Sequence, residues 1–276
     1  MLFSSKQQRT LLKLLSLFSL VRGYNIIILI IAQYLTARYI LAPQHSWWGL
    51  LFDFDFFSIV IASALTTAAG YIINNFYDAS KDQINRPKKY ILEHLVSQQI
   101  QLVLILILNM TAFIFASIIS FRAVLFFLFY MFAIWLYSFR VKRLFWLSNL
   151  FSTLLMIFPF WAITLYFKNF DSLVFFHAGY LFFLILGRDI IKDLENFKGD
   201  WVQRYRTLPI VFDNTLTKWI ITICLLGSLI PNFYIIKYPL GLMYFYFGIS
   251  PLYLILVLVF LWRANDQKTY LWLHNL

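Results

Sequence analysis

The chain has few of the residues on which disulfide-rich, nucleotide-binding and metal-thiolate proteins depend. Its one cysteine, Cys224, allows no disulfide within the chain and argues against a thiolate metal site. Only 9 glycines are present, and none forms the G-x-G-x-x-G pattern of a phosphate-binding loop. The 4 histidines, His45, His94, His177 and His274, are too widely spaced for a histidine metal site.

Charge is scarce as well. Charged residues make up 13% of the chain, about half the usual share in soluble domains. Hydrophobic residues make up 62%, and several runs exceed the roughly 18 apolar residues that suggest a membrane span. A single soluble core cannot cover this much apolar surface, so the composition predicts an all-α polytopic membrane helical bundle.

The apolar runs predict eight spans, and the last contains Gly241, Gly248 and Pro251, which allow it to kink or split. The expected spans are 24–40, 56–73, 100–120, 123–139, 144–167, 173–187, 217–236 and 239–262.

Basic residues are distributed very unequally between the two sides of this bundle. Of the 23 Lys and Arg, all but Arg38, Arg122, Lys168 and Lys237 fall on the side of the N-terminus and the two longest connections. The positive-inside rule then places that side in the cytoplasm, and it accounts for the net charge of +11 without nucleic acid. We expect a bacterial inner-membrane protein whose residues 1–22 form a cytoplasmic interfacial segment.

Eight of the 12 acidic residues lie in those two connections, 74–99 and 188–216, which are expected to be long and polar. In the first, Asn74, Asp78 and Asp82 are spaced i, i+4, i+8, so a helix would align three oxygen-bearing side chains on one face. Like charges at this spacing repel each other unless a cation neutralises them. Ordinary solvated charges are the alternative interpretation of such a row.

The second connection repeats the pattern with Asp189, Asp193 and Asn196, spaced by four and then three residues. Each cluster directly follows an apolar span, a position where ionisable residues are functional candidates. Oxygen-only ligands favour Mg²⁺, which retains water and is completed by substrate phosphates. Two facing clusters would hold Mg²⁺ bridged by a diphosphate. Basic residues that could bind the diphosphate oxygens are Arg22, Lys142, Arg143, Arg188 and Lys192.

At these residues the chain resembles the UbiA superfamily of membrane prenyltransferases. Asn74, Asp78 and Asp82 match the family motif N-D-x-x-D-x-x-x-D, with Asn75 in place of an Asp. In the second acidic motif, Asn196 stands where a third carboxylate is common. Further matches are Arg22-Gly23-Tyr24-Asn25 to R-P-x-N, Tyr137-Ser138 with Lys142-Arg143 and Asn149-Leu150 to Y-S…K-R…N-L, Gly199-Asp200 to G-D, and Thr207-Leu208-Pro209 to T-L-P.

The resemblance implies one domain over residues 1–276, a bundle around a central cavity open to lipid, and usually nine helices. It implies transfer of a prenyl group from a prenyl diphosphate to a lipophilic or aromatic acceptor. The catalytic residues would be Asp78, Asp82, Asp189 and Asp193. The Mg²⁺ ligands would be Asn74, Asp78, Asp82, Asp189, Asp193 and Asp200. The substrate-binding residues would be Arg22, Asn25, Tyr137, Lys142, Arg143, Arg188 and Lys192. Tyr77, Tyr137 and Asp78 are candidates to lie beside the acceptor.

Within the family, Ile84-Asn85-Arg86-Pro87 and the second acidic motif are most similar to digeranylgeranylglyceryl phosphate synthase-like members, which alkylate a glycerol-phosphate lipid. Three alternatives stay open: an aromatic-ring prenyltransferase of quinone biosynthesis, a membrane transporter, and an inactive scaffold homologue. Acidic residues at the membrane edge, rather than the midplane site of transporters, favour an enzyme. The missing charges at Asn75 and Asn196 are the support for a scaffold.

Overall fold

A computed structural model describes residues 5–239 and 241–275, with side chains described from residue 11 onward. Met1–Ser4 of the expected interfacial segment lie outside this description. Throughout the described residues the regular structure is helical, without strands. Within residues 5–239 and 241–275, eight helical segments are long and apolar enough to cross a membrane, which confirms the fold class and the number of spans.

The elements follow one another as α1 (Ser5–Leu20), α2 (Gly23–Thr36), η1 (Ala37–Leu41), α3 (Trp47–Leu51), α4 (Phe54–Asn85), α5 (Pro87–Glu93), α6 (Gln98–Ile119), α7 (Phe121–Phe139), η2 (Val141–Arg143), α8 (Leu147–Phe167), α9 (Ser172–Val202), α10 (Leu208–Val211), α11 (Asn214–Gly227), α12 (Leu229–Ile235), α13 (Met243–Arg263) and α14 (Gln267–Asn275).

Two helices extend well beyond their expected ends. The structure continues α4 to Asn85 and α9 to Val202, whereas the expected spans stop at residues 73 and 187. The prediction of two long polar loops was therefore wrong, because most of both segments is helical. α4 ends where Pro87 follows, since a proline disfavours helical backbone in the preceding residue; Arg86 has φ −141°.

The last span, which the sequence marked as able to kink or split, does not split. α13 runs without interruption from Met243 to Arg263 and includes Pro251. The seventh span is divided instead, because α11 ends at Gly227 and α12 starts at Leu229. Pro231 lies just beyond this division and has no N–H to continue the helical hydrogen bonding.

Aspartate side chains cap the start of α4 and of α11. Asp53 accepts a hydrogen bond from Phe56 N at 3.0 Å, at the start of α4. Asp213, one of the eight clustered acidic residues, accepts from Leu216 N at 2.6 Å and starts α11. A carboxylate here satisfies an unpaired backbone N–H and favours the positive end of the helix dipole. Asp213 is thus explained without a metal or substrate.

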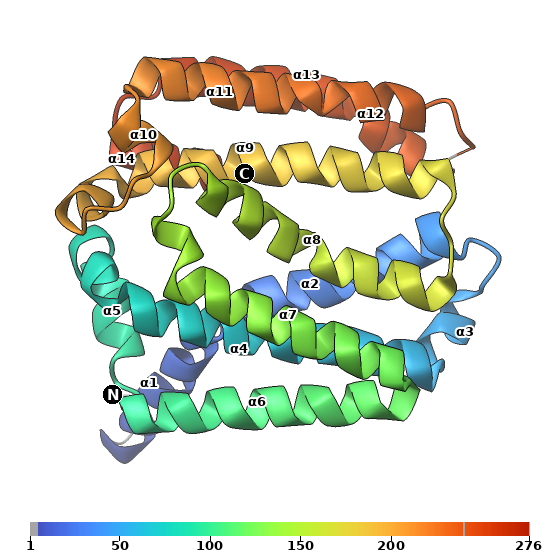
Figure 1. The fold of residues 1–276 in the computed structure, drawn as a ribbon, viewed down its shortest axis with the longest axis horizontal. Coiled ribbons are helices and arrows are strands. Elements are labelled where there is room, and N and C mark those ends of the chain that lie inside the picture. The colour runs from blue at the N-terminus through green and yellow to red at the C-terminus, as the bar shows by residue number, and fades with distance from the viewer. Residues whose placement is uncertain (1–4, 240, 276) are drawn as a thin grey trace. The chain divides into compact units, whose positions relative to one another are not determined.

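The chain forms two compact units. The first comprises the chain up to Leu35 together with Trp47–Phe139, and in it α4 packs along α6 and α7 (Figure 1). Most of the buried residues of α4 are small. A Cβ at Gly70 would lie 2.9 Å from Ile134 Cγ2 of α7, so glycine permits this close approach. Small residues at helix contacts are typical of membrane bundles.

The second unit comprises Thr36–Ser46 and the chain from Arg140 onward. Here α9 is the central helix, in contact with α8, α10, α11, α12 and α14 (Figure 1). A Cβ at Gly187 would lie 2.8 Å from Leu225 Cδ2 of α11, so these two helices also approach closely at a glycine. The packing around α9 fixes the helix that carries the second acidic cluster.

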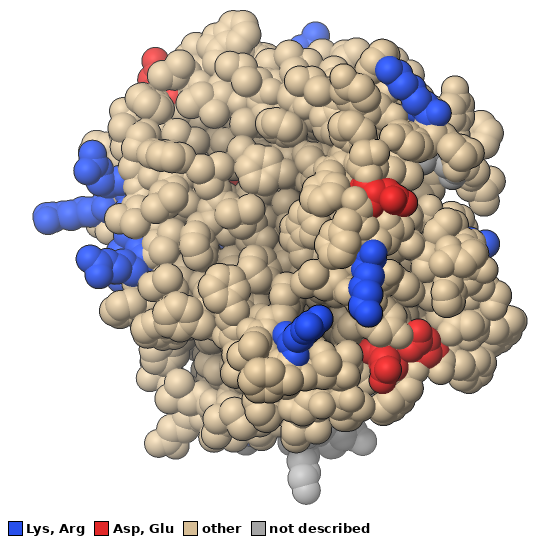
Figure 2. Space-filling model, turned by 45° about the vertical axis from the view of Figure 1, so that its right-hand side comes forward, with Lys and Arg blue, Asp and Glu red and all other residues tan. Residues whose placement is uncertain are grey.

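Large apolar side chains remain exposed along the spans. Leu106 of α6 is 59% exposed and Leu252 of α13 is 64% exposed. Figure 2 shows a face that uncharged side chains mostly cover, with charged ones gathered at its left edge and lower right. An apolar surface of this kind fits lipid as the surrounding medium.

Candidate functional site

The first acidic cluster occupies the last turns of α4. Asn74, Asp78 and Asp82 all lie within one continuous helix, and all three are half-buried. Their spacing of four residues therefore places them on one face, as predicted. This face, which we call the first acidic row, presents two carboxylates and one amide.

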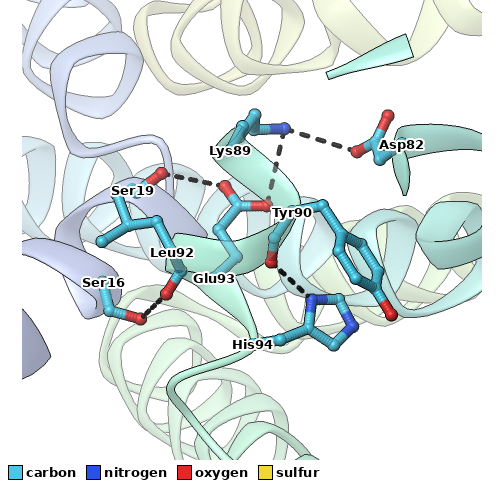
Figure 3. Close-up of polar contacts among 8 residues, drawn as sticks. All are labelled: Ser16, Ser19, Asp82, Lys89, Tyr90, Leu92, Glu93 and His94. Atoms are coloured by element: carbon cyan, nitrogen blue, oxygen red, sulfur yellow. Dashed lines mark hydrogen bonds and ion pairs between the residues drawn. The ribbon is translucent and has the colours of Figure 1, made fainter. Parts of the chain in front are cut away.

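A lysine on the next helix lies between the end of this row and a buried carboxylate (Figure 3). Lys89 Nζ of α5 is 3.5 Å from Asp82 Oδ2 and 3.6 Å from Glu93 Oε2. Glu93 is only 1% exposed. One ammonium group thus faces two carboxylates, and one of them belongs to the first acidic row.

Helix α1 holds that buried carboxylate in place (Figure 3). Ser19 Oγ donates to Glu93 Oε1 at 2.9 Å, and Ser16 Oγ donates to the Leu92 carbonyl oxygen at 2.7 Å. Both bonds join residues more than 70 positions apart in the sequence. The N-terminal helix therefore supports the end of the first acidic row through α5.

The predicted substrate-binding residues Arg22 and Asn25 lie where α1 turns into α2. The Arg22 guanidinium carbon is 4.7 Å from the ring centroid of Tyr71, which lies one turn before Asn74 on α4. Arg22 has φ +50°, and the Asn25 N–H donates to the Arg22 carbonyl at 2.8 Å. A Cβ on Gly23 would overlap the Phe18 ring, which explains glycine in this tight turn.

The two tyrosines named as candidate acceptor neighbours also belong to the first unit. Tyr77 lies between Asn74 and Asp78 on α4 and packs edge-to-face on Phe139 of α7, with ring centroids 6.1 Å apart. Tyr137 is half-buried on α7, two residues before Phe139. Both side chains are thus near the same end of the α4–α7 pair.

The second acidic cluster lies on α9 and is organised by an asparagine. Asn149 of α8 is 2% exposed, and its Nδ2 donates to Asp189 Oδ2 at 3.2 Å and to Asp193 Oδ2 at 2.8 Å. Two like charges one helical turn apart would repel each other. The amide protons offset this repulsion by lying against both carboxylates, the position that a bridging cation would prefer.

Other predicted residues of this half surround the same helix. Asn196 is 4% exposed and Asp200 is fully buried, with its carbonyl oxygen accepting from Tyr205 N at 2.9 Å. Lys142 is buried in η2. The Arg143 guanidinium carbon lies 5.9 Å from the ring centroid of Tyr205. Tyr205 thus links the connection after α9 to the basic segment before α8.

Arg188 is held toward the C-terminal helix. Its Nε donates to the His274 carbonyl oxygen of α14 at 2.8 Å. His274 Nδ1 lies 2.8 Å from Glu195 Oε2, and both side chains are nearly buried. Burial lowers the pKa of His274; Glu195 offsets part of this decrease, while the positive charges of Arg188 and Lys192 add to it. Besides the acidic cluster of Asp189 and Asp193, α9 therefore has polar side chains, Arg188 and Glu195, that bind α14.

The donor set fits Mg²⁺ bound together with a substrate. Across residues 5–239 and 241–275, no group of three or more His, Cys, Asp or Glu side chains is arranged to hold a metal ion. Each acidic row supplies two carboxylates by itself. Mg²⁺ is usually held by one or two carboxylates, several waters and substrate phosphates. The cation-like position of the Asn149 amide between Asp189 and Asp193 supports this fit.

Several residues around the rows were not predicted from the sequence as site residues. Asn149 appeared only within a family-like segment, although a polar residue in an apolar span is a usable signal. Lys89 follows Asp82 by seven residues, and this spacing could have indicated that the two side chains lie on the same side of the turn between α4 and α5. Glu195 and His274 gave no such signal, because their contact joins positions 79 residues apart.

These features define a polytopic helical membrane protein with carboxylate rows at the ends of two long spans. The chain belongs to the UbiA prenyltransferase family, which it matches over residues 27–275. It is therefore a membrane prenyltransferase. This result supports the enzyme interpretation over the transporter and scaffold alternatives.

Known proteins resemble the chain in sequence or in fold. The digeranylgeranylglyceryl phosphate synthase of Thermococcus sibiricus is 32% identical over 192 residues, which cover 68% of this chain and 67% of the relative. That of Haloquadratum walsbyi is 30% identical over 218 residues, covering 76% and 73%. A UbiA homolog from Archaeoglobus fulgidus, solved with DMAPP and Mg²⁺, superposes with a TM-score of 0.71 at 13% identity, covering 94% of this chain and 95% of that structure.

Proposed function

We propose that the chain transfers a prenyl group from an isoprenoid diphosphate to a hydroxyl group of a prenylated glycerol-phosphate lipid, with Mg²⁺ as cofactor. The observation that carries the proposal is the α9 carboxylate pair, Asp189 and Asp193, held together by Asn149. The acceptor class rests on relatives such as those of Thermococcus sibiricus and Haloquadratum walsbyi. We propose that the two units act as a single prenyltransferase domain.

In this proposal the two acidic rows supply the metal ligands. Bound Mg²⁺ would neutralise the negative charge that develops on the departing diphosphate. The ligands are Asn74, Asp78 and Asp82 on α4, and Asp189, Asp193 and Asp200 on α9. Basic side chains bind the diphosphate oxygens through charge-assisted hydrogen bonds: Arg22, Lys142, Arg143, Arg188 and Lys192.

The reaction replaces one carbon–oxygen bond by another. The bond between the allylic carbon and the diphosphate oxygen breaks, and both electrons leave with the diphosphate. The acceptor hydroxyl oxygen attacks the electron-poor allylic carbon and then loses its proton. Asp78, Tyr77 and Tyr137 are the proposed polar neighbours of the acceptor. Aromatic faces stabilise positive charge on the allylic carbon by cation–π attraction.

Direct turnover tests this proposal. Purified protein with Mg²⁺, labelled geranylgeranyl diphosphate and geranylgeranylglyceryl phosphate should form an ether lipid and release pyrophosphate. Asp78→Ala and Asp189→Ala should each lower turnover by about 100-fold or more, the scale of losing electrostatic stabilisation of the departing group. Unchanged turnover in these variants would show that the metal ligands are misassigned. Transfer to 4-hydroxybenzoate instead would assign an aromatic acceptor.

The charge distribution supports an orientation in the cytoplasmic membrane. We propose that the N-terminus and both acidic rows face the cytoplasm, where water-soluble diphosphates are present. In a Cys224→Ala background, Lys88→Cys and Arg122→Cys place single thiols on opposite predicted sides. An impermeant maleimide added to intact cells should label the Arg122→Cys protein only. Labelling of Lys88→Cys alone would reverse the orientation.

A further inference from the structure

We propose that the Lys89 ammonium group is a counter-ion for both Asp82 and the buried carboxylate of Glu93. A metal ion that binds Asp82 then displaces this ammonium group toward Glu93. This inference rests on the proposed function, because it concerns the metal affinity of the first acidic row. Lys89 and Glu93 are then positioning residues, because they affect metal binding through Asp82.

The geometry places Lys89 between two nearly equivalent partners (Figure 3). Its Nζ is 3.5 Å from Asp82 Oδ2 and 3.6 Å from Glu93 Oε2. These distances allow ion pairing but exceed a normal N–H···O hydrogen bond. Lys89 is therefore not fixed to either carboxylate, and a small rotation of its flexible stem brings it to one or the other.

Glu93 has the properties of a permanent anchor. Its carboxylate is 1% exposed, and Oε1 accepts the Ser19 hydroxyl at 2.9 Å. Oε2 has no hydrogen-bond partner among the described residues, and Lys89 is its ion-pair neighbour. A buried carboxylate is costly without a compensating charge. Glu93 therefore retains the Lys89 ammonium beside the row even when Asp82 takes another partner.

Asp82, in contrast, is the accessible partner of the two. Its side chain is 16% exposed, compared with 1% for Glu93. Before metal binds, Lys89 offsets the repulsion between Asp78 and Asp82, which lie one turn apart. A divalent cation at Asp82 repels the ammonium, and Glu93 receives it. Metal binding is thus a competition whose midpoint depends on both Lys89 and Glu93.

Metal titration of purified protein without substrate tests this competition, and Lys88→Gln is a matched control because Lys88 is exposed on the same helix. Mn²⁺ is the probe, with free Mn²⁺ measured by electron paramagnetic resonance. Lys89→Gln should tighten Mn²⁺ binding by about two- to fivefold, the range for a partly exposed ion pair. Lys88→Gln should change it less than Lys89→Gln.

Glu93→Gln should have the opposite effect. The glutamine keeps the side-chain size and can still accept the Ser19 hydroxyl, but Lys89 is then left with Asp82 alone. Mn²⁺ binding should weaken by about two- to fivefold. A general loss of negative charge would produce the same sign, so the double variant Lys89→Gln/Glu93→Gln is required. If Glu93 acts through Lys89, adding Glu93→Gln to Lys89→Gln should change the affinity little.

The outcomes separate this inference from the proposed function. Opposite single-variant shifts with strong coupling in the double variant support the competition. Additive shifts, equal shifts for Lys88→Gln and Lys89→Gln, or no Mn²⁺ binding in any variant overturn it. Lys89→Arg, which retains the charge, should restore the wild-type affinity. Prenyl transfer is assayed separately, so an inactive protein that shows the coupled shifts rejects the function and leaves the metal competition standing.

Discussion

Asn149 Nδ2 of α8 lies 2.8 Å from Asp193 Oδ2 of α9, and the same amide group also donates to Asp189. One neutral side chain thus donates hydrogen bonds to two anionic groups. This arrangement preorganises the α9 row before any cation is bound. In the metal-free protein it also lowers the cost of burying Asp189 and half-burying Asp193.

Asn149→Asp should convert this support into repulsion. Without metal, the variant should lose about 1.5 to 3 kcal/mol, the value of hydrogen bonds to charged groups, and unfold at a lower temperature. Added Mg²⁺ should raise its unfolding temperature more than that of the wild type, because three carboxylates then surround the cation site. The measurement is thermal unfolding in detergent with Mg²⁺ or EDTA.

Asn232→Asp is the matched control for this experiment. Asn232 is another buried asparagine of the second unit, and its Nδ2 donates to the Phe247 carbonyl at 3.2 Å rather than to a carboxylate. The substitution should destabilise the protein, but Mg²⁺ should not rescue it. Equal rescue of both variants would argue against a metal-positioning role for Asn149.

Close packing of α9 should also affect the site. Gly187→Ala places a Cβ 2.8 Å from Leu225 Cδ2 of α11, so Leu225 or the helix must move. Gly187 lies two residues before Asp189, and we expect a loss of about 1 to 3 kcal/mol from overpacking together with reduced turnover. Unfolding midpoints and prenyl transfer measure the two effects.

Gly179→Ala on the same helix provides the comparison. Its Cβ would lie 3.9 Å from the nearest Pro231 atom, an ordinary contact. Alanine also favours helix formation over glycine by about 1 kcal/mol, so stability should be unchanged or higher. Equal destabilisation by both substitutions would mean that the α9–α11 approach at Gly187 carries no special constraint.

The sequence predicted the parts of this protein that depend on local pattern. Apolar runs defined eight spans, and the spacing of Asn74, Asp78 and Asp82 defined a helical face; the structure confirms both. The four-residue periodicity even predicted helix where span length alone predicted loop. Hydropathy ends a predicted span at the first polar residues. The helices α4 and α9 continue past those residues because neither sequence contains a proline.

Long-range partners could not be predicted in the same way. The bond from Ser19 to Glu93 and the contact of Glu195 with His274 each join residues more than 70 positions apart. Such contacts depend on how helices pack, which no local spacing encodes. The sequence excluded His274 from a histidine metal site, and the structure shows that its side chain packs against Glu195 of α9.

The contact of His274 with α9 predicts a pH dependence of stability. Burial lowers the pKa of His274 below its ordinary value of 6.5, so the folded state binds the proton less readily than the unfolded state. This contribution to stability is complete above the ordinary value and is lost as the pH falls through the lower folded value. The slope attributable to one proton is at most about 1.4 kcal/mol per pH unit.

His274→Gln should reduce the loss of stability at low pH, because glutamine does not titrate. Thermal unfolding between about pH 5 and about pH 8 measures the slope for wild type and variant. His45→Gln is the control, since His45 is exposed in the second unit. This substitution should leave the loss of stability at low pH unchanged. A slope that survives in the His274→Gln variant would assign the acid sensitivity to other groups, because His274 is the buried imidazole that contacts Glu195.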